Sequence, residues 1–147
     1  MSEFSPGARS RGTTVARICV STARSILIAD DDSDVREALS FALRDEGFSV
    51  RAAGDAYEAR RLFVACRPDL VLSDVRMPGN GLRLLHDLQA VSPGTPVILM
   101  TGFEQPGDRK RAFAEGAADF LVKPVVGERL RSALTRALSR GASDASE

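Results

Sequence analysis

The stretch Ser25-Ile-Leu-Ile-Ala-Asp-Asp-Asp32 predicts the first strand of a parallel sheet and the polar edge at which that strand ends. A short apolar run that is bounded by polar residues on both sides is typical of a strand covered by helices on both faces. Asp69-Leu-Val-Leu-Ser-Asp74 repeats this pattern further along the chain. We therefore expect a buried, mostly parallel sheet with carboxylates at the ends of its strands.

Outward from this stretch, apolar runs alternate with segments of helical period as far as Arg140. The predicted strands cover residues 25–29, 48–52, 69–73, 97–100 and 119–122, and the predicted helices cover residues 33–46, 56–66, 82–91, 109–115 and 127–140. Such alternation predicts a doubly wound α/β sheet, whose ligand site lies at the carboxyl ends of the strands.

Length and composition favour one folded domain. The chain has 147 residues, of which 44% are hydrophobic, so a single buried core is feasible. Residues 1–24 are rich in Ser, Gly, Thr and Arg, and we expect a flexible arm there, a folded domain over residues 25–140 and a tail over residues 141–147. Cys19 and Cys66 are far apart in the sequence and are expected to be free thiols.

The charge balance bears on the class of partner. The 20 basic and 20 acidic residues cancel, so no overall field attracts nucleic acid or an anionic membrane. No apolar run approaches the ~20 residues of a membrane span, and no signal-peptide pattern stands at the start. We expect a cytoplasmic protein that has a protein partner and does not bind nucleic acid or membrane directly.

Side chains of complementary chemistry stand at the predicted strand ends: Asp30, Asp31, Asp74, Thr101 and Lys123. Three carboxylates ~4 Å apart repel by ~4 kcal/mol per pair at an effective dielectric near 20, so they need a neutralising partner. Oxygen ligands without sulfur or imidazole suit Mg²⁺, and a lysine ammonium suits a phosphoryl oxygen. Asp32 and Ser33 are better explained as caps of the following helix.

These positions lie in four motifs, Ile26-Leu-Ile-Ala-Asp-Asp-Asp32, Leu72-Ser-Asp-Val-Arg-Met-Pro78, Met100-Thr-Gly102 and Phe120-Leu-Val-Lys-Pro124, which together resemble the response regulator receiver domain. The resemblance spans residues 25–140. It implies a flavodoxin-like sheet of strand order 2-1-3-4-5 with five helices. It also implies a phosphorylation-activated switch of a two-component system, which is a phosphoacceptor and not otherwise an enzyme.

The resemblance assigns roles at the metal and phosphorylation site. Asp74 resembles the phosphoacceptor, and Mg²⁺ would be ligated by Asp31, Asp74 and the backbone carbonyl of Arg76, with Asp30 acting mainly through a bound water. Lys123 resembles the lysine that pairs with the phosphoryl group. The phosphoryl donor would be a histidine kinase or a phosphotransfer protein.

It also assigns a switch. Thr101 resembles the hydroxyl that binds the phosphoryl group, and Phe120 resembles the aromatic that changes rotamer on activation, which alters the surface formed by residues 109–140. The target would be an unknown downstream protein or effector domain, and a phosphorylation-dependent homodimer is left open. The Lys123-Pro124 bond is expected to be cis. The loop Met77-Pro-Gly-Asn-Gly81 is one residue shorter than is usual in the family.

Other functions compete with this interpretation. A phosphohydrolase of the haloacid dehalogenase type would use Asp30 as nucleophile with Thr101 and Lys123, but it needs a later acidic pair and leaves Asp74 unexplained. An EF-hand is excluded because Val35 and Phe41 occupy the glycine and glutamate positions. A third possibility is that the chain is the receiver fragment of a transcriptional regulator, although the sequence after residue 140 contains no DNA-binding helix pair.

Overall fold

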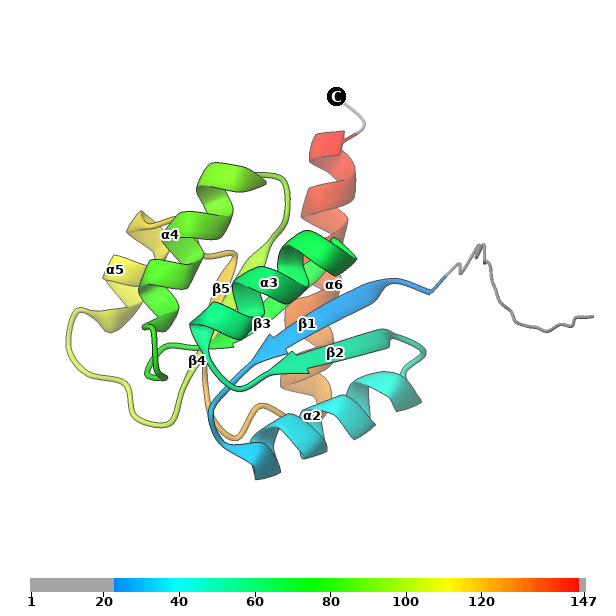
Figure 1. Cartoon of the computed structure of the whole chain (residues 1–147), viewed down its shortest axis with the longest axis horizontal. Helices are drawn as coiled ribbons and strands as arrows, with labels where there is room; N and C mark the ends of the chain where they lie inside the picture. The colour runs from blue at the N-terminus through cyan, green and yellow to red at the C-terminus, as the bar shows by residue number, and fades with distance from the viewer. Residues whose placement is uncertain (1–22, 146–147) are drawn as a thin grey trace, which may run out of the picture.

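The computed structural model describes residues 23–145 and contains a five-stranded parallel sheet in the order β2-β1-β3-β4-β5. The strands are β1 (Ser25–Ala29), β2 (Ser49–Ala53), β3 (Leu70–Asp74), β4 (Val97–Thr101) and β5 (Asp119–Val122). The helices between and after them are α2 (Ser33–Asp45), α3 (Ala56–Cys66), α4 (Gly81–Val91), α5 (Asp108–Ala114) and α6 (Gly127–Ala145). The predicted α/β class, strand order and five helices are confirmed (Figure 1).

Helices cover both faces of the sheet, as the continuous apolar strands require. Successive residues of β1 point to opposite faces, with Leu27 and Ala29 in one core cluster and Ile26 and Ile28 in the other. The first cluster includes residues of α3, α4 and α5, and the second includes residues of α2 and α6. In Figure 1, α3 and α4 lie in front of the sheet and α6 lies behind it.

The helix starts follow from side-chain caps. Asp32 precedes α2, and its carboxylate accepts hydrogen bonds from the backbone N–H groups of Asp34 (2.9 Å) and Val35 (3.4 Å). The predicted capping role of Asp32 is therefore confirmed, whereas Ser33 is the first helical residue rather than a cap. Asp55 caps α3 in the same way.

Several boundaries differ from the sequence prediction. Strand β2 begins at Ser49 rather than at residue 48, because its register is set by pairing with β1, where Ser49 lies opposite Ser25. Helix α6 continues to Ala145, past the predicted end at Arg140 and into the predicted tail. A single glycine at position 141 costs a helix only ~1 kcal/mol, so it weakens this helix without ending it.

The predicted arm lies outside the described residues except for its last two, and Cys19 lies outside them altogether. The carbonyl of Arg24 already accepts a hydrogen bond from the N–H of Ser49 (2.9 Å), so sheet-like contact begins one residue before β1. Cys66 is a free thiol. None of the helices within residues 23–145 has the length and hydropathy needed to cross a membrane.

Candidate functional site

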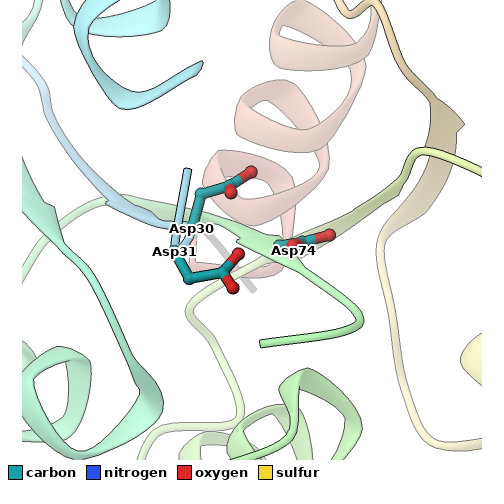
Figure 2. A group of neighbouring side chains, drawn as sticks. All are labelled: Asp30, Asp31 and Asp74. Carbon is teal, nitrogen blue, oxygen red and sulfur yellow. The ribbon is translucent and has the colours of Figure 1, made fainter. Parts of the chain in front are cut away.

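The three carboxylates meet at the carboxyl edge of the sheet. Strands β1 and β3 are hydrogen-bonded neighbours, so Asp30 and Asp31, which follow β1, lie beside Asp74, which ends β3. One carboxylate oxygen from each of the three lies within 4.8 Å of the others. Figure 2 shows the three side chains gathered at this edge. Asp30 and Asp74 are buried and Asp31 is exposed, so the group opens to solvent on the side of Asp31.

Lys123 brings one positive charge into this group. Its Nζ lies 2.6 Å from Oδ2 of Asp30 and 3.5 Å from Oδ1 of Asp74. The lysine follows β5, and its backbone N–H donates to the carbonyl of Thr101 (2.8 Å), which ties it to the end of β4. The Lys123-Pro124 bond is cis, as predicted. Three carboxylates and one ammonium leave two negative charges uncompensated within the group.

These charges alter proton affinity in a consistent way. Burial raises the pKa of Asp74 above its ordinary value and the charge of Asp30 raises it further, while Lys123 opposes both effects. Burial alone would lower the pKa of Lys123, but its hydrogen bond to Asp30 and the charge of Asp74 raise it overall. The lysine therefore stays charged, whereas the negative charge of Asp74 is disfavoured by its surroundings.

Thr101 ends β4 and is buried next to this edge. Its hydroxyl donates to the carbonyl of Phe103 (3.0 Å) and accepts from Nη1 of Arg76 (2.9 Å). The sequence assigned Arg76 a role through its backbone carbonyl, and this contact of its side chain was not predicted. A loop residue gives little indication in the sequence of where its side chain points, because that direction depends on the path of the loop.

Phe120, the predicted switch aromatic, lies inside the protein. The residue is 1% exposed and belongs to the core cluster that also contains Leu99 and Ala112. The guanidinium of Arg109 lies over the ring, 5.0 Å from its centroid, and Nη1 of Arg109 donates to the carbonyl of Phe120 (3.1 Å). Arg109 thus covers Phe120 from the side of α5.

The shortened loop brings α4 close to Asp74. Asn80, which has a φ of +69°, caps α4 through hydrogen bonds from the N–H groups of Leu82 (2.8 Å) and Arg83 (3.3 Å). Gly81 packs so closely that a Cβ atom there would clash with the backbone carbonyl of Asp74. The tight turn therefore requires glycine at position 81, and it fixes the backbone on one side of the acidic group.

Two further side chains, outside the acidic group, are exposed. His86 on α4 is 68% exposed, and its Nδ1 lies 3.8 Å from a carboxylate oxygen of Glu115. Phe103 is also exposed at 72%.

Comparison with known proteins agrees with this geometry. The family model of the response regulator receiver domain matches residues 26–135. The chain is 38% identical over 119 residues to the C4-dicarboxylate transport transcriptional regulatory protein DctD of Rhizobium meliloti. The aligned region covers 80% of this chain and 26% of that protein. It is also 38% identical over 117 residues to the probable transcriptional regulatory protein TcrX of Mycobacterium tuberculosis, covering 76% of this chain and 50% of that protein.

Solved structures show the same likeness. The chemotaxis protein CheY4 of Vibrio cholerae superposes with a TM-score of 0.74 at 32% identity, covering 79% of this chain and 99% of that one. A CheY-like receiver domain protein from Methanospirillum hungatei gives a TM-score of 0.79 at 26% identity, covering 84% and 99%. The chain thus spans most of the single-domain structures, but only a quarter to a half of the two curated relatives.

The haloacid dehalogenase alternative is wrong, because the family model and the relatives agree on the receiver domain. The structure gives the physical reason. Within residues 23–145, β5 is the last strand and helix α6 follows it, so no further strand end supplies the acidic pair that such a hydrolase needs.

Proposed function

The chain belongs to the response regulator receiver domain family and is a phosphorylation-activated switch of a two-component system; on this premise we propose that Asp74 is the residue that accepts the phosphoryl group. One observation carries the proposal: Asp74 is a buried carboxylate at a strand end, with the ammonium of Lys123 at 3.5 Å and a carboxylate oxygen of each of Asp30 and Asp31 within 4.8 Å. Of the three aspartates, Asp74 alone is the last residue of a strand. Its distance to the ammonium of Lys123 is 3.5 Å, whereas Asp30 forms a short ion pair of 2.6 Å with that lysine.

The donor set fits a hard divalent cation. Carboxylate oxygens from three residues within 4.8 Å, with two net negative charges, match the preference of Mg²⁺ for oxygen ligands. We propose that Asp31, Asp74 and the backbone carbonyl of Arg76 hold the ion directly and that Asp30 acts through water. When bound, Mg²⁺ would neutralise the carboxylates and the incoming phosphoryl oxygens.

The residues of the chain then divide the work of transfer. A carboxylate oxygen of Asp74 attacks phosphorus, so that the new O–P bond forms as the P–N bond to the donor histidine breaks and the histidine leaves. Lys123 offers its ammonium to the transferred oxygens from beside Asp74 and Asp30. The hydroxyl of Thr101 has to leave the carbonyl of Phe103 before it can donate to a phosphoryl oxygen.

The partners follow from this chemistry. The donor would be a histidine kinase or a phosphotransfer protein, and the chain would undergo its own phosphorylation without acting on another substrate. Relatives such as DctD and TcrX are transcriptional regulatory proteins longer than the matched region, which supports a downstream effector domain or protein as the target. A phosphorylation-dependent homodimer is compatible with the same scheme.

Acetyl phosphate tests the proposal without the cognate kinase. The protein is incubated with acetyl phosphate and Mg²⁺, and the modified residue is located by mass spectrometry. We expect an acyl phosphate on Asp74, no incorporation with EDTA, and none in Asp74→Asn, because an amide is not a competent nucleophile. Phosphate on Asp30 or Asp31, or undiminished incorporation by Asp74→Asn, would overturn the assignment.

A further inference from the structure

Arg76 connects the end of β4 to the start of α5. Its Nη1 donates to Oγ1 of Thr101 (2.9 Å). Its Nη2 donates to Oε1 of Gln105 (3.2 Å) and to Oδ2 of Asp108 (2.9 Å), which is the first residue of α5. One planar guanidinium therefore holds the predicted switch hydroxyl with one nitrogen and the first turn of a helix with the other.

The hydroxyl of Thr101 is fully engaged in this arrangement. A hydroxyl has one hydrogen to donate and two lone pairs that accept. The hydrogen goes to the carbonyl of Phe103 (3.0 Å), and the lone pairs accept from Nη1 of Arg76 (2.9 Å) and from the N–H of Phe103 (3.3 Å). If the hydrogen turns toward a phosphoryl oxygen on Asp74, the lone pairs turn with it. The contact with Arg76 then cannot keep its present geometry.

The far end of the contact holds a weak helix. Helix α5 has seven residues, of which only Ala112 is buried, and its N-cap residue Gly107 offers no side-chain hydrogen bond. In place of a cap, Oδ2 of Asp108 accepts from the N–H of Gln105 (2.8 Å) and from Arg76. The hydrogen bond from Arg76 is the main reason that the pKa of Asp108 lies below its ordinary value. An element with so little burial has a position that a few contacts can bias.

We propose that Arg76 is a positioning residue that transmits phosphorylation of Asp74 from the Thr101 hydroxyl to the first turn of α5. This inference rests on the proposed function, since it takes Asp74 as the phosphorylated residue. The guanidinium is a rigid fork, whose Nη1 also donates to the carbonyl of Phe103 (3.4 Å), so a movement of Nη1 with Thr101 is passed to Nη2 and its contact with Asp108. A lysine at position 76 would keep the charge, but its single ammonium lacks the fork.

The experiment compares the wild-type chain of 147 residues with Arg76→Gln, Arg76→Lys and Asp108→Asn. Arg83→Gln is the matched control, because Arg83 is an arginine on α4 that is 70% exposed and whose ion pair, at 3.6 Å, is with Asp87 of the same helix. Each protein is phosphorylated with acetyl phosphate and Mg²⁺, and mass spectrometry gives the phosphorylated fraction at Asp74. Amide NMR shifts over residues 101–114 are then compared at equal phosphorylated fractions.

In wild type and Arg83→Gln we expect phosphorylation-dependent shifts over residues 108–114. In Arg76→Gln, Arg76→Lys and Asp108→Asn these shifts should fall several-fold, while the Thr101 amide still responds. In the unphosphorylated protein, Asp108→Asn should already shift the Thr101 amide, because Arg76 joins the two side chains.

The outcomes separate the two claims. Full shifts over residues 108–114 in phosphorylated Arg76→Gln would overturn the role of Arg76 while leaving Asp74 as the phosphoacceptor. Full shifts in Arg76→Lys alone would show that charge suffices, and would overturn transmission by the fork. A wild type that takes no phosphate on Asp74 would overturn the proposed function. Transmission of phosphorylation through Arg76 would then be refuted too, even if Asp108→Asn changed the NMR shift of the Thr101 amide.

Discussion

Replacing Asp74 with asparagine removes a negative charge from the acidic group with little change of shape, and we expect the variant to be more stable than wild type in EDTA. At 4.8 Å, the upper limit of their separation, and an effective dielectric near 20, each of Asp30 and Asp31 repels Asp74 by at least about 3.5 kcal/mol, and Lys123 at 3.5 Å attracts it by about 5 kcal/mol. Because Asp31 is exposed and its charge is screened, the net gain from the substitution is about 1–2 kcal/mol.

The pH dependence follows from the raised pKa of Asp74 in the folded protein. In the unfolded chain this carboxyl titrates near its ordinary value of 3.8, so between the two values the folded state binds the proton more tightly. The destabilisation by charged Asp74 is fully present above the raised pKa and disappears as pH falls through it toward 3.8. The stability advantage of Asp74→Asn should shrink over the same window.

Thermal unfolding followed by circular dichroism, with EDTA and at pH values from neutral to about 4, measures both effects. A gain of about 1–2 kcal/mol corresponds to roughly 3–8 °C in Tm for a domain of this size. Asp45→Asn, a substitution at an exposed residue of α2, is the matched control and should change stability by less than about 0.5 kcal/mol. An Asp74→Asn protein that is less stable at neutral pH, or whose advantage does not vary with pH, would refute the electrostatic argument.

Four further changes test the site. Asp31→Ala should weaken the rise of Tm on adding Mg²⁺, which mass action predicts for a native-state ligand, and an unchanged Mg²⁺ titration would count against Asp31 as a ligand. Gly81→Ala should cost about 1–3 kcal/mol in urea unfolding, because its Cβ meets the Asp74 carbonyl, whereas Gly94→Ala, with open space around it, should cost little. Phe103→Ala should shorten the half-life of the phosphorylated protein if this ring shields the phosphoryl group from water, and an equal or longer half-life rejects shielding. Thr101→Ala should accept phosphate but lose most phosphorylation-dependent NMR shifts around Phe120; full wild-type shifts there would disprove the coupling.

The sequence predicted the sheet and the acidic group for one physical reason. Continuous apolar runs such as residues 70–72 and 97–100 are buried on both faces only in the middle of a helix-covered sheet, and β3 and β4 are buried at every position. Parallel strands place all their carboxyl ends at one edge, so residues as distant in sequence as Asp30 and Lys123 are brought within 2.6 Å. Topology carries this prediction, and no knowledge of side-chain packing was needed.

Prediction was weaker wherever a result depends on a loop or an edge. Strand β2 is at the edge of the sheet and is exposed at three of its five residues, so its apolar pattern is a weak guide to where the strand begins and ends. Its limits are set by its pairing with β1. The direction of the Arg76 side chain depends on the turn after β3. No spacing rule links that residue to Asp108, which lies 32 positions later.

Two arginines, Arg76 in contact with α5 and Arg109 within it, explain how Thr101 and Phe120 can be coupled although no hydrogen bond joins their side chains in the described part of the protein. Arg76 links the Thr101 hydroxyl to Asp108, and the next residue of α5, Arg109, lies over the Phe120 ring and bonds its carbonyl. Because Asp108 and Arg109 share one helical turn, a shift of the first carries the second with it. The cover over Phe120 would then move when Thr101 turns to a phosphoryl group, and the buried ring would gain freedom to change rotamer. On this route the signal passes through α5 before it reaches β5, so loss of the Arg76 contact should silence α5 and Phe120 together.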